Sequence, residues 1–318
     1  MTGFAEVTLT NWVTPLLLLW SIFLLDLWLG DPVYRFHPIR LIGSLLIYLE
    51  RWLFARGWNG YTGGILLGLL LLGIVLGCYF LLQKLFGSLH PVFGWSLDLF
   101  LGYSLLALRD LEIHGLRVWR ATAEGNLMAA REEISQLVGR DVERLDLAGC
   151  NRATLESLSE NLSDGVVSPL IWLTLVGIPG MLAFKVISTM DSMVGYRNSR
   201  YLRFGWFGAR ADDLMNWVPA RLTWVLLSIS AWVLPDYDGR MAWSIGLSQH
   251  QYMSGPNAGW GQAASAGALR VQLVGEKWKN GRLQHNAWLG NPDDPSQIGA
   301  DSIPCLLYTS DAADDVEC

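Results

Sequence analysis

Apolar residues in this chain are collected into long blocks that alternate with polar connections. The clearest block, residues 63–82 (GGILLGLLLLGIVLGCYFLL), contains no charged side chain and has the length that crosses the hydrocarbon core of a bilayer. Residues 15–30, 93–108 and 218–234 form three further blocks, each with one charged residue. The pattern predicts a transmembrane helix over each of these four blocks.

The polar connections show helical periodicity too. From Ile39 onward, apolar residues recur at intervals of three and four, which predicts an amphipathic helix lying at the membrane interface. The same spacing predicts a helical insertion over residues 109–164. Within it we expect one helix to end near Gly139, Asp141 to cap the next turn and Asn151 to start another helix.

The apolar stretch after this insertion is interrupted. Residues 166–176 are too few to cross a bilayer, and Ile178-Pro179-Gly180 follows directly, so we expect a broken or re-entrant element of two half-helices. Arginines outnumber acids in residues 31–60, which places that connection and the helical insertion in the cytoplasm and the N-terminus outside.

Composition supports this picture. Of the 318 residues, 52% are hydrophobic and only 16% are charged, which is unusually apolar for a soluble domain. No basic segment precedes the first apolar block, so we expect that block to remain in the mature protein. The net charge of −6 is spread over mixed acids and bases, which argues against a nucleic-acid partner. The four cysteines are widely separated, so neither a zinc site nor a disulfide framework is indicated.

The predicted fold class is therefore all-α: a polytopic membrane helix bundle with a broken helix and a cytoplasmic helical insertion. We expect residues 1–300 to form a single domain. The Ala/Gly run within SGPNAGWGQAASAGALRVQL, residues 254–273, is suited to close packing against another helix. Residues 301–318 show no periodicity and do not continue the preceding pattern, so we expect a non-native tail.

Three acids are candidates for chemistry. Glu156, Glu160 and Asp164 are spaced at i, i+4 and i+8, so a continuous helix would place them in one row, with Asn161 beside it. Such a row favours a hard cation such as Mg²⁺, held by carboxylates, an amide and water. The alternative is a solvated helix face.

A second polar group borders the later apolar stretches. Asp191 follows a half-helix, and Asp212, Asp213 and Asn216 stand just before the last span. Each of these side chains could cap a helix, although together they outnumber the helix starts that they would serve. We therefore keep metal or nucleotide contact as the second interpretation.

Arginines and one histidine complete the set. Arg197, Arg200, Arg203, Arg210 and Arg221 offer guanidinium groups to phosphate or carboxylate oxygens, or they anchor lipid headgroups. The aromatic residues among them suit a membrane interface or a large flat ligand. His37, with Arg40 on the next turn, is a candidate for acid–base or phosphate contact, or it has a structural role before Pro38.

Five segments together resemble the CobD/CbiB family of cobalamin biosynthesis, the adenosylcobinamide-phosphate synthases. The match runs from about residue 24 to 290, and the segments follow the family's order. The segments are DLWLGDPVYRFHPIRLIG, VGRDVERLD, ESLSENLSDGVVSPL, GIPGMLAFKVISTMDSMVGYRNSRYLRFGWFGARADDLMNWVPARLT and PNAGWGQAASAGAL.

The resemblance implies a multi-pass enzyme of the bacterial inner membrane. It would join adenosylcobyric acid to (R)-1-aminopropan-2-ol or its O-phosphate, forming an amide with ATP consumed. The carboxylate has to be activated, most simply as an acyl phosphate, before the amine attacks. Such chemistry needs Mg²⁺, cationic side chains around the phosphate and a base for the ammonium group.

The candidate residues match these needs in kind. We assign metal and nucleotide contact, with the acid–base roles, to Glu160, Asn161, Asp164, Asp191 and Asp212. Phosphate or substrate contact is assigned to Arg197, Arg200, Arg210, Arg221 and Asn216, with His37 and Arg40 in support. The metal ligands among them would be Glu160, Asp164 and Asp191.

Two other classes of function remain open. A non-enzymatic membrane sensor or assembly protein would need the spans but not the acids with their matching arginines. A transporter would suit a broken helix with buried acids, but the chain has no internal repeat. The expected partners of an enzyme would be the lipid bilayer, the two substrates and other cobalamin-assembly enzymes.

Overall fold

The computed structural model describes residues 3–30, 34–279 and 281–307, and for residues 3–14 it describes the backbone only. The chain divides into two compact units, the first made of residues up to Arg109 with Ser168–Met215, and the second of Asp110–Val167 with the chain from Asn216 onward. Residues 110–164 of the predicted insertion thus share the second unit with the C-terminal part.

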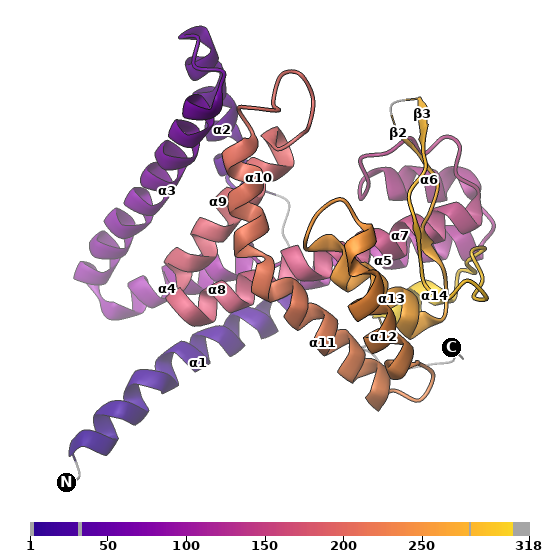
Figure 1. Ribbon diagram of the computed structural model, residues 1–318. Helices are drawn as coiled ribbons and strands as arrows, with labels where there is room; N and C mark the ends of the chain where they lie inside the picture. Colours follow the sequence, from indigo (N-terminus) through magenta and orange to yellow (C-terminus); the bar gives the residue numbers. More distant parts are fainter. Residues whose placement is uncertain (1–2, 31–33, 280, 308–318) are drawn as a thin grey trace. The chain divides into compact units, whose positions relative to one another are not determined.

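The first unit is helical. Its helices are α1 (Gly3–Leu29), α2 (Pro38–Ala55), α3 (Tyr61–Leu89), α4 (Pro91–Ser104), α8 (Ser168–Val176), α9 (Ile178–Val194) and α10 (Trp206–Met215) (Figure 1). Its core lies where α2, α3 and α9 meet, with Leu46, Leu71 and Met190 fully buried. The amphipathic pattern after Ile39 therefore forms α2 as predicted, with its apolar side on α3 and α9.

Glycines let the segment before α10 approach α3 closely. A side chain at Gly64 would overlap the backbone of Phe204, and one at Gly68 would overlap the ring of Phe207. Phe204 is fully buried and its ring contacts Phe54 edge-on, with the ring centroids 4.8 Å apart. The segment that carries the predicted arginines is therefore fixed to the first unit at this point.

The predicted interruption near residue 178 is confirmed. α8 ends at Val176, Gly177 has a φ of 75°, and α9 begins at Ile178 with Pro179 in its first turn. Proline suits the first turn because the amide hydrogens there have no acceptor within the helix. The two short helices pack against each other, so the element is a helical hairpin rather than a kinked span.

Acids within two predicted spans have partners inside the first unit. Asp26 is fully buried, and its carboxylate accepts hydrogen bonds from the backbone amides of Leu108 and Arg109, at 3.0 and 3.2 Å. It thereby satisfies the first two amide groups of the helix that begins at Leu108. Asp98 accepts from the Tyr79 hydroxyl at 2.9 Å. These contacts offset the cost of placing acids in apolar helices.

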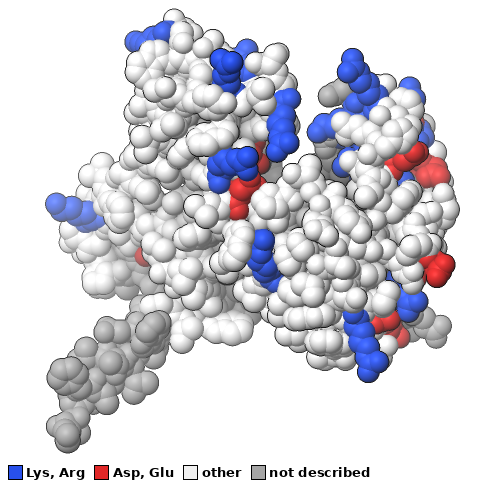
Figure 2. Space-filling model, in the orientation of Figure 1, with Lys and Arg blue, Asp and Glu red and all other residues white. Residues whose placement is uncertain are grey.

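Two helical stretches of the described chain are long and apolar enough to cross a membrane, Tyr61–Leu89 and Pro91–Ala123. The second is interrupted after Ser104 and continues in α5 (Leu108–Ala123). Two predicted spans correspond to shorter apolar helices, Pro15–Leu29 and Trp217–Val233. In the first unit, the face shown in Figure 2 is largely uncharged over α3 and α4.

The second unit combines helices with short strands. It contains α5 (Leu108–Ala123, which begins at the end of the first unit), α6 (Leu127–Ser135), α7 (Leu147–Asn161), the π-helical turn η1 (Leu162–Val167), α11 (Trp217–Val233), α12 (Gly239–Gln249), the 3₁₀ turn η2 (His250–Tyr252), α13 (Ala258–Leu269) and α14 (Ser302–Leu307). Its strands are β1 (Leu273–Val274), β2 (Lys277–Lys279), β3 (Arg282–Gln284) and β4 (Trp288–Leu289).

Helix α13 lies at the centre of this unit and packs against α7, α11 and α12. Its small residues permit this close packing. A side chain at Gly261 would overlap the carbonyl of Ser159 on α7, and one at Gly267 would overlap the backbone of Met241 on α12. The prediction that the Ala- and Gly-rich stretch packs closely against another helix is confirmed.

The strands correct the all-α prediction. β1 pairs with β4, and β2 pairs with β3, each pair antiparallel. The two pairs span only two or three residues per strand, too few for an alternating apolar pattern to be recognised. The chain stays mostly helical, but after Arg270 the β2–β3 hairpin lies between the paired strands β1 and β4.

One local prediction in the insertion is wrong. Asn151 does not start a helix: α7 begins at Leu147 with Asp146 as its cap, and the buried Asn151 donates to the carbonyl of Ile298 instead. For Asp141, the expected cap on the next turn stays a prediction. Its carboxylate accepts from the amide of Gly281 at 2.7 Å, so it fixes the β2–β3 hairpin to the loop after α6.

The predicted tail lies partly outside the described residues. Residues 308–318 are not described, whereas Ser302–Leu307 forms α14, which packs against α7 and α13. Ile303 in this helix is fully buried. The single-domain prediction for residues 1–300 and the non-native origin of the tail both stay predictions.

Candidate functional site

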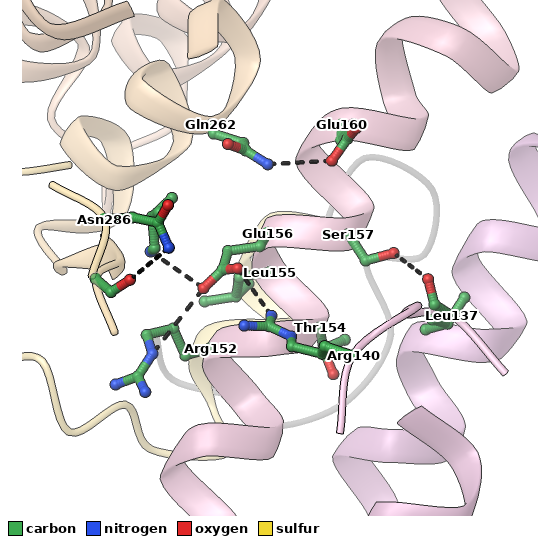
Figure 3. A network of polar contacts seen from close by, with 12 residues as sticks. Leu137, Arg140, Arg152, Thr154, Leu155, Glu156, Ser157, Glu160, Gln262 and Asn286 are labelled. Atoms are coloured by element: carbon green, nitrogen blue, oxygen red, sulfur yellow. Dashed lines mark hydrogen bonds and ion pairs between the residues drawn. The ribbon is translucent and has the colours of Figure 1, made fainter. Parts of the chain in front are cut away.

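Glu156 is the centre of a buried ionic network in the second unit (Figure 3). Its carboxylate lies 2.8 Å from the Arg140 guanidinium, and both side chains are less than a tenth exposed. It also accepts from the backbone amide of Val274 at 3.1 Å, and the Arg152 guanidinium lies 4.0 Å away. Glu156 therefore connects the loop after α6, helix α7 and strand β1.

Glu160 lies one helical turn later and has a different environment. It is exposed, and it accepts a hydrogen bond at 3.3 Å from the side-chain amide of Gln262 on α13. Gln262 itself is only 3% exposed. The next residue, Asn161, donates its amide hydrogens to the carbonyl and hydroxyl of Ser157, at 2.9 and 3.1 Å. The C-terminal end of α7 thus presents an accessible carboxylate that is supported by a buried amide.

The helix changes form just after these residues. Residues 162–167 form the π-helical turn η1, which contains Asp164 and packs against α11 and α13. π turns are rare and occur frequently at functional sites. Ser163 is 8% exposed, and its hydroxyl has no hydrogen-bond partner among the described residues. The predicted row of three acids is wrong as a continuous α-helical row, because the wider turn displaces Asp164 from the expected position.

Basic residues also lie on the β2–β3 hairpin and in the loop after α6. Burial lowers the pKa of Lys277 on β2, while the charges of Glu156 and, less strongly, Glu160 raise it. Arg144 stacks on the ring of Trp278, with its guanidinium carbon 3.7 Å from the ring centroid. In Figure 2, charged side chains of the second unit gather over the part that carries α6 and the β2–β3 hairpin.

Arg221 and Asn216 also belong to this unit. Arg221 donates to the carbonyl of Trp217 at 2.6 Å and to the side-chain oxygen of Asn257 at 3.2 Å, and its guanidinium lies over the rings of Trp217 and Trp260. Asn216 is buried just before α11. The predicted phosphate ligand Arg221 is thus already engaged by neighbouring groups.

A separate acidic group lies in the first unit. Burial raises the pKa of Asp191 on α9, and the charge of Asp213 on α10 raises it further. A side chain at Gly195 would overlap the carboxylate of Asp191, so glycine leaves room for it. Arg210 forms an ion pair with Asp213 at 3.3 Å, next to Asp212. The acids and Arg210 predicted for this segment therefore belong to one helix pair.

Arg200 has a partner that the sequence analysis missed. Glu50 on α2 is buried, and one of its carboxylate oxygens accepts two hydrogen bonds from Arg200, at 2.8 and 3.2 Å, and one from the Tyr201 hydroxyl at 2.9 Å. Arg197 and Arg203 in the same loop are exposed. The structure therefore makes Arg200 an anchor of the loop and leaves Arg197 and Arg203 at its surface.

His37 occupies the cap of α2. Its Nδ1 accepts a hydrogen bond from the amide of Ile39 at 3.3 Å, and the side chain is buried. This arrangement supports the structural interpretation of His37. Arg40, in the first turn of α2, is exposed.

The candidate residues are thus divided between the two units. The second unit holds Glu160, Asn161, Asp164, Asn216 and Arg221. The first unit holds His37, Arg40, Asp191, Arg197, Arg200, Arg210 and Asp212. Among the described residues, no group of three or more histidine, cysteine, aspartate or glutamate side chains is arranged to hold a metal ion.

Sequence reasoning missed Gln262, Glu50 and Lys277. Gln262 had a usable signal, because it is the single long polar side chain among the small residues of AGWGQAASAGAL. Glu50 and Lys277 carried no such signal. The charged residues of their segments are expected at the surface, so nothing in the sequence indicated that these two are partly or fully buried.

Comparisons with known proteins match most of the chain to one family. The family profile described as "CobD/Cbib protein" matches residues 19–304. A cobalamin biosynthesis protein CobD of Geobacter metallireducens is 42% identical over 272 residues, 86% of this chain and 85% of the relative. The CobD of Yersinia enterocolitica is 39% identical over 289 residues, 90% of each chain. A cobalamin biosynthesis protein CbiB of Salmonella choleraesuis is 36% identical, covering 91% of each. No solved structure matches this chain.

Proposed function

The chain belongs to the CobD/CbiB family of cobalamin biosynthesis, and from this premise we propose that it is a carbon–nitrogen ligase. It would join adenosylcobyric acid to (R)-1-aminopropan-2-ol or its O-phosphate, with ATP consumed, to give adenosylcobinamide or its phosphate. The observation that carries this proposal is the end of α7, where the accessible carboxylate of Glu160 meets the buried amide of Gln262 beside a π-helical turn.

That arrangement suits the chemistry of amide formation. An ammonium group has to lose a proton before it can attack a carboxyl carbon, and a carboxylate within hydrogen-bond reach can bind it and accept the proton. Glu160 is accessible for this role, whereas Glu156 is engaged by Arg140 and by the amide of Val274. The further acids proposed for proton transfer or nucleotide contact are Asp164, Asp191 and Asp212, with His37 in support.

Mg²⁺ fits the candidate residues in kind. Glu160, Asp164 and Asp191 carry oxygen atoms, which Mg²⁺ prefers, and this ion is often held by one or two carboxylates together with water and substrate phosphates. A preformed cluster of three carboxylates is therefore not required. When bound, Mg²⁺ would neutralise the charge of the ATP phosphates.

Cationic side chains would bind the phosphate groups. Arg197 is exposed on the loop before α10, and Arg40 is exposed at the start of α2, so both guanidinium groups can reach a ligand. Arg200, Arg210 and Arg221 have protein partners. We propose that these three orient the surrounding loops and contact phosphate with their remaining donors, together with the amide of Asn216.

We further propose a multi-pass location in the bacterial inner membrane, with other cobalamin-assembly enzymes as neighbours. The apolar stretches Tyr61–Leu89 and Pro91–Ala123 support this location. On α3, large apolar side chains such as Leu69, Leu81 and Leu85 are more than half exposed, which suits contact with lipid.

The helical hairpin α8–α9 favours a second candidate, a transporter, because broken helices are typical of transporter binding sites. The two functions differ in what they consume. Amide synthesis requires ATP hydrolysis and leaves a new covalent product, whereas gradient-driven transport leaves the substrate chemically unchanged. A membrane sensor or assembly protein would do neither.

The test is mass spectrometry of the product. Membranes that contain the chain would receive adenosylcobyric acid, aminopropanol or its phosphate, Mg²⁺ and ATP, and matched membranes without the chain serve as the control. We expect the mass of the amide to appear only with the chain and only with ATP. If the folded protein in the membrane yields no amide with either amine, the ligase proposal fails.

A further inference from the structure

The two faces of the β2–β3 hairpin differ in charge. Side chains alternate along a strand, and residues directly opposite each other in an antiparallel pair lie on the same face. The register places Lys277 opposite Gln284 and Lys279 opposite Arg282. These four side chains therefore share one face, which carries three cations, one amide and no acid. This face is called the cationic face below.

The other face of the hairpin is covered and balanced in charge. Trp278 lies on it, and the guanidinium carbon of Arg144 is 3.7 Å from the centroid of the Trp278 ring. The one acid in residues 276–285 is Glu276, and its carboxylate lies 2.7 Å from His285. The acid of this hairpin is thus paired outside the cationic face and does not neutralise it.

The cationic face holds two like charges directly opposite each other, Lys279 and Arg282. Such a pair destabilises a sheet. Neither side chain has an ion pair or a hydrogen bond among the described residues. Arg282 is exposed and Lys279 is partly exposed, so both can reach a ligand. An anion bound between them would replace the repulsion by attraction.

Lys277 extends the positive charge to the base of the hairpin. Burial lowers its pKa most strongly, the charge of Glu156 raises it, that of Arg140 lowers it, and that of Glu160 raises it less strongly. Glu156 already pairs with Arg140, and the Arg152 guanidinium lies 4.0 Å from the same carboxylate. One buried acid is therefore surrounded by three cations. Figure 2 shows Lys and Arg side chains gathered over this part of the second unit.

The loop after α6 holds the hairpin in place. The amide of Gly281 donates to the carboxylate of Asp141 at 2.7 Å, and the amide of Asp141 donates to the carbonyl of Trp278 at 3.1 Å. Arg144, on the Trp278 ring, belongs to the same loop. All of these residues lie in the second unit. The cationic face is thus positioned in advance, which reduces the entropy that a ligand has to overcome on binding.

The ligand that suits this face carries several negative charges close together. Lys277 and Lys279 are two residues apart along a strand, about 7 Å, and residues opposite each other in an antiparallel pair are about 5 Å apart. Lysine and arginine are the usual side chains that bind phosphate oxygens. The three phosphates of ATP match three neighbouring cations better than the single phosphate of a lipid headgroup does. The sequence also has no familiar phosphate-binding loop.

We propose that the cationic face of the β2–β3 hairpin binds the phosphates of ATP. The proposal rests on the ligase function above and assigns its nucleotide subsite. Lys279 and Arg282 bind phosphate oxygens from the two strands, and Lys277 adds positive charge at the base. The arginines that are proposed above for phosphate contact then serve the phosphate of the amine substrate.

The experiment measures ATP binding directly and needs no turnover. The full chain in detergent is titrated by calorimetry with ATP and Mg²⁺, without adenosylcobyric acid or the amine. We expect the double variant Lys279→Gln with Arg282→Gln to bind ATP about tenfold more weakly or worse, because two charge-assisted contacts are lost. Inorganic triphosphate should compete with ATP for the wild type, and its affinity should decrease in parallel in the double variant.

Two further variants keep the result interpretable. Arg282→Gln alone alters an exposed side chain, so it should fold even if the double variant does not, and it should weaken ATP binding in the same direction. Arg240→Gln removes the same charge from an exposed position at the start of α12, in the same unit. This control should keep the wild-type affinity for ATP.

Thermal unfolding gives a second readout that a merely structural role would not produce. Without ATP, the double variant should unfold at the wild-type temperature or higher, since the repulsion between the two cations is removed. The increase in unfolding temperature that ATP gives the wild type should be absent from the double variant. A double variant that unfolds earlier but keeps its affinity for ATP would make the hairpin cations structural and overturn the proposal.

The outcomes also separate the nucleotide from a lipid and the subsite from the ligase function. If the double variant loses affinity for phosphatidylglycerol in mixed micelles but binds ATP like the wild type, the face binds lipid headgroups and the proposal is overturned. ATP binding that depends on the hairpin, without any amide product, contradicts the ligase function and supports the subsite. Amide formation with wild-type ATP affinity in both hairpin variants contradicts the subsite alone.

Discussion

Two glutamates on one helix, a single turn apart, have opposite environments. Glu156 is buried and meets Arg140, Arg152 and the amide of Val274, whereas Glu160 is exposed and accepts from Gln262. From their spacing in the sequence alone, the two residues would be equivalent members of one row of acids. Their surroundings make the first a structural residue of the second unit, and we propose ligand contact for the second.

The difference follows from what covers each turn of α7. At Glu156, the loop after α6 and strand β1 bring donors to the carboxylate, so its accepting capacity is largely used. At Glu160, the small residues of α13 allow that helix to approach closely, and a single long side chain reaches across. We propose that this exposed carboxylate near a rare π turn takes part in the chemistry.

The same contrast occurs among the arginines of the first unit. Arg200 is bound to the buried Glu50 although 55% of its own side chain is exposed, and Arg197, three residues earlier, is exposed as well. One loop therefore contains an arginine that is held by a buried carboxylate and another that lies at the surface. In both units, a buried carboxylate organises the segment and a neighbouring charged group is left accessible.

The largest effect on stability is expected from Glu156→Gln. The variant keeps an acceptor for the amide of Val274 but leaves Arg140 as a buried charge without its counter-ion. Breaking a buried ion pair in this way costs about 3–5 kcal/mol. Thermal unfolding of the protein in detergent would be monitored as the loss of the monodisperse protein peak. The midpoint temperature of unfolding should be clearly lower than that of the wild type.

The matched control is the double variant Arg140→Met with Glu156→Gln. It removes the uncompensated charge as well, and replacing a buried pair by apolar groups is often nearly neutral. We expect the double variant to unfold at a higher temperature than the single variant. Equal stability of Glu156→Gln and the wild type would contradict the structural role of this carboxylate.

A smaller and more local effect is expected from Glu50→Gln. The loss of the carboxylate charge weakens the hydrogen bonds to Arg200 and to the Tyr201 hydroxyl, so the loop before α10 should open more often. Limited proteolysis should show several-fold faster cleavage between residues 195 and 205, with the midpoint of global unfolding nearly unchanged.

Arg203→Gln provides the comparison for this loop, because Arg203 is an exposed arginine in the same segment. It should leave the cleavage rate at the wild-type value. If Glu50→Gln is cleaved no faster than Arg203→Gln, Glu50 does not anchor the loop.

Periodicity and block length predicted the helices well. The charge-free block at residues 63–82 lies inside α3, the amphipathic pattern after Ile39 forms α2, and the break near Pro179 separates α8 from α9. These features depend on local composition, which the sequence displays directly. The family resemblance was confirmed by matches along most of the chain.

Long-range contacts set the limits of the prediction. Asn151 looked like a helix start, but its amide serves the distant carbonyl of Ile298, and the cap of α7 is Asp146 instead. The π turn at residues 162–167 has no local signal, so the acids were placed in one α-helical row. Gln262 and Glu50 act through partners 102 and 150 residues away, which spacing alone does not reveal.

The central claim is that the end of α7 and the π turn carry the chemistry, and Asp164→Asn tests it most directly. The rate of amide formation would be measured by mass spectrometry in membranes supplied with adenosylcobyric acid, aminopropanol phosphate, Mg²⁺ and ATP, together with the amount of protein in the membrane. The account predicts no amide above background with an unchanged amount of membrane-bound protein. Amide formation at the wild-type rate would contradict it.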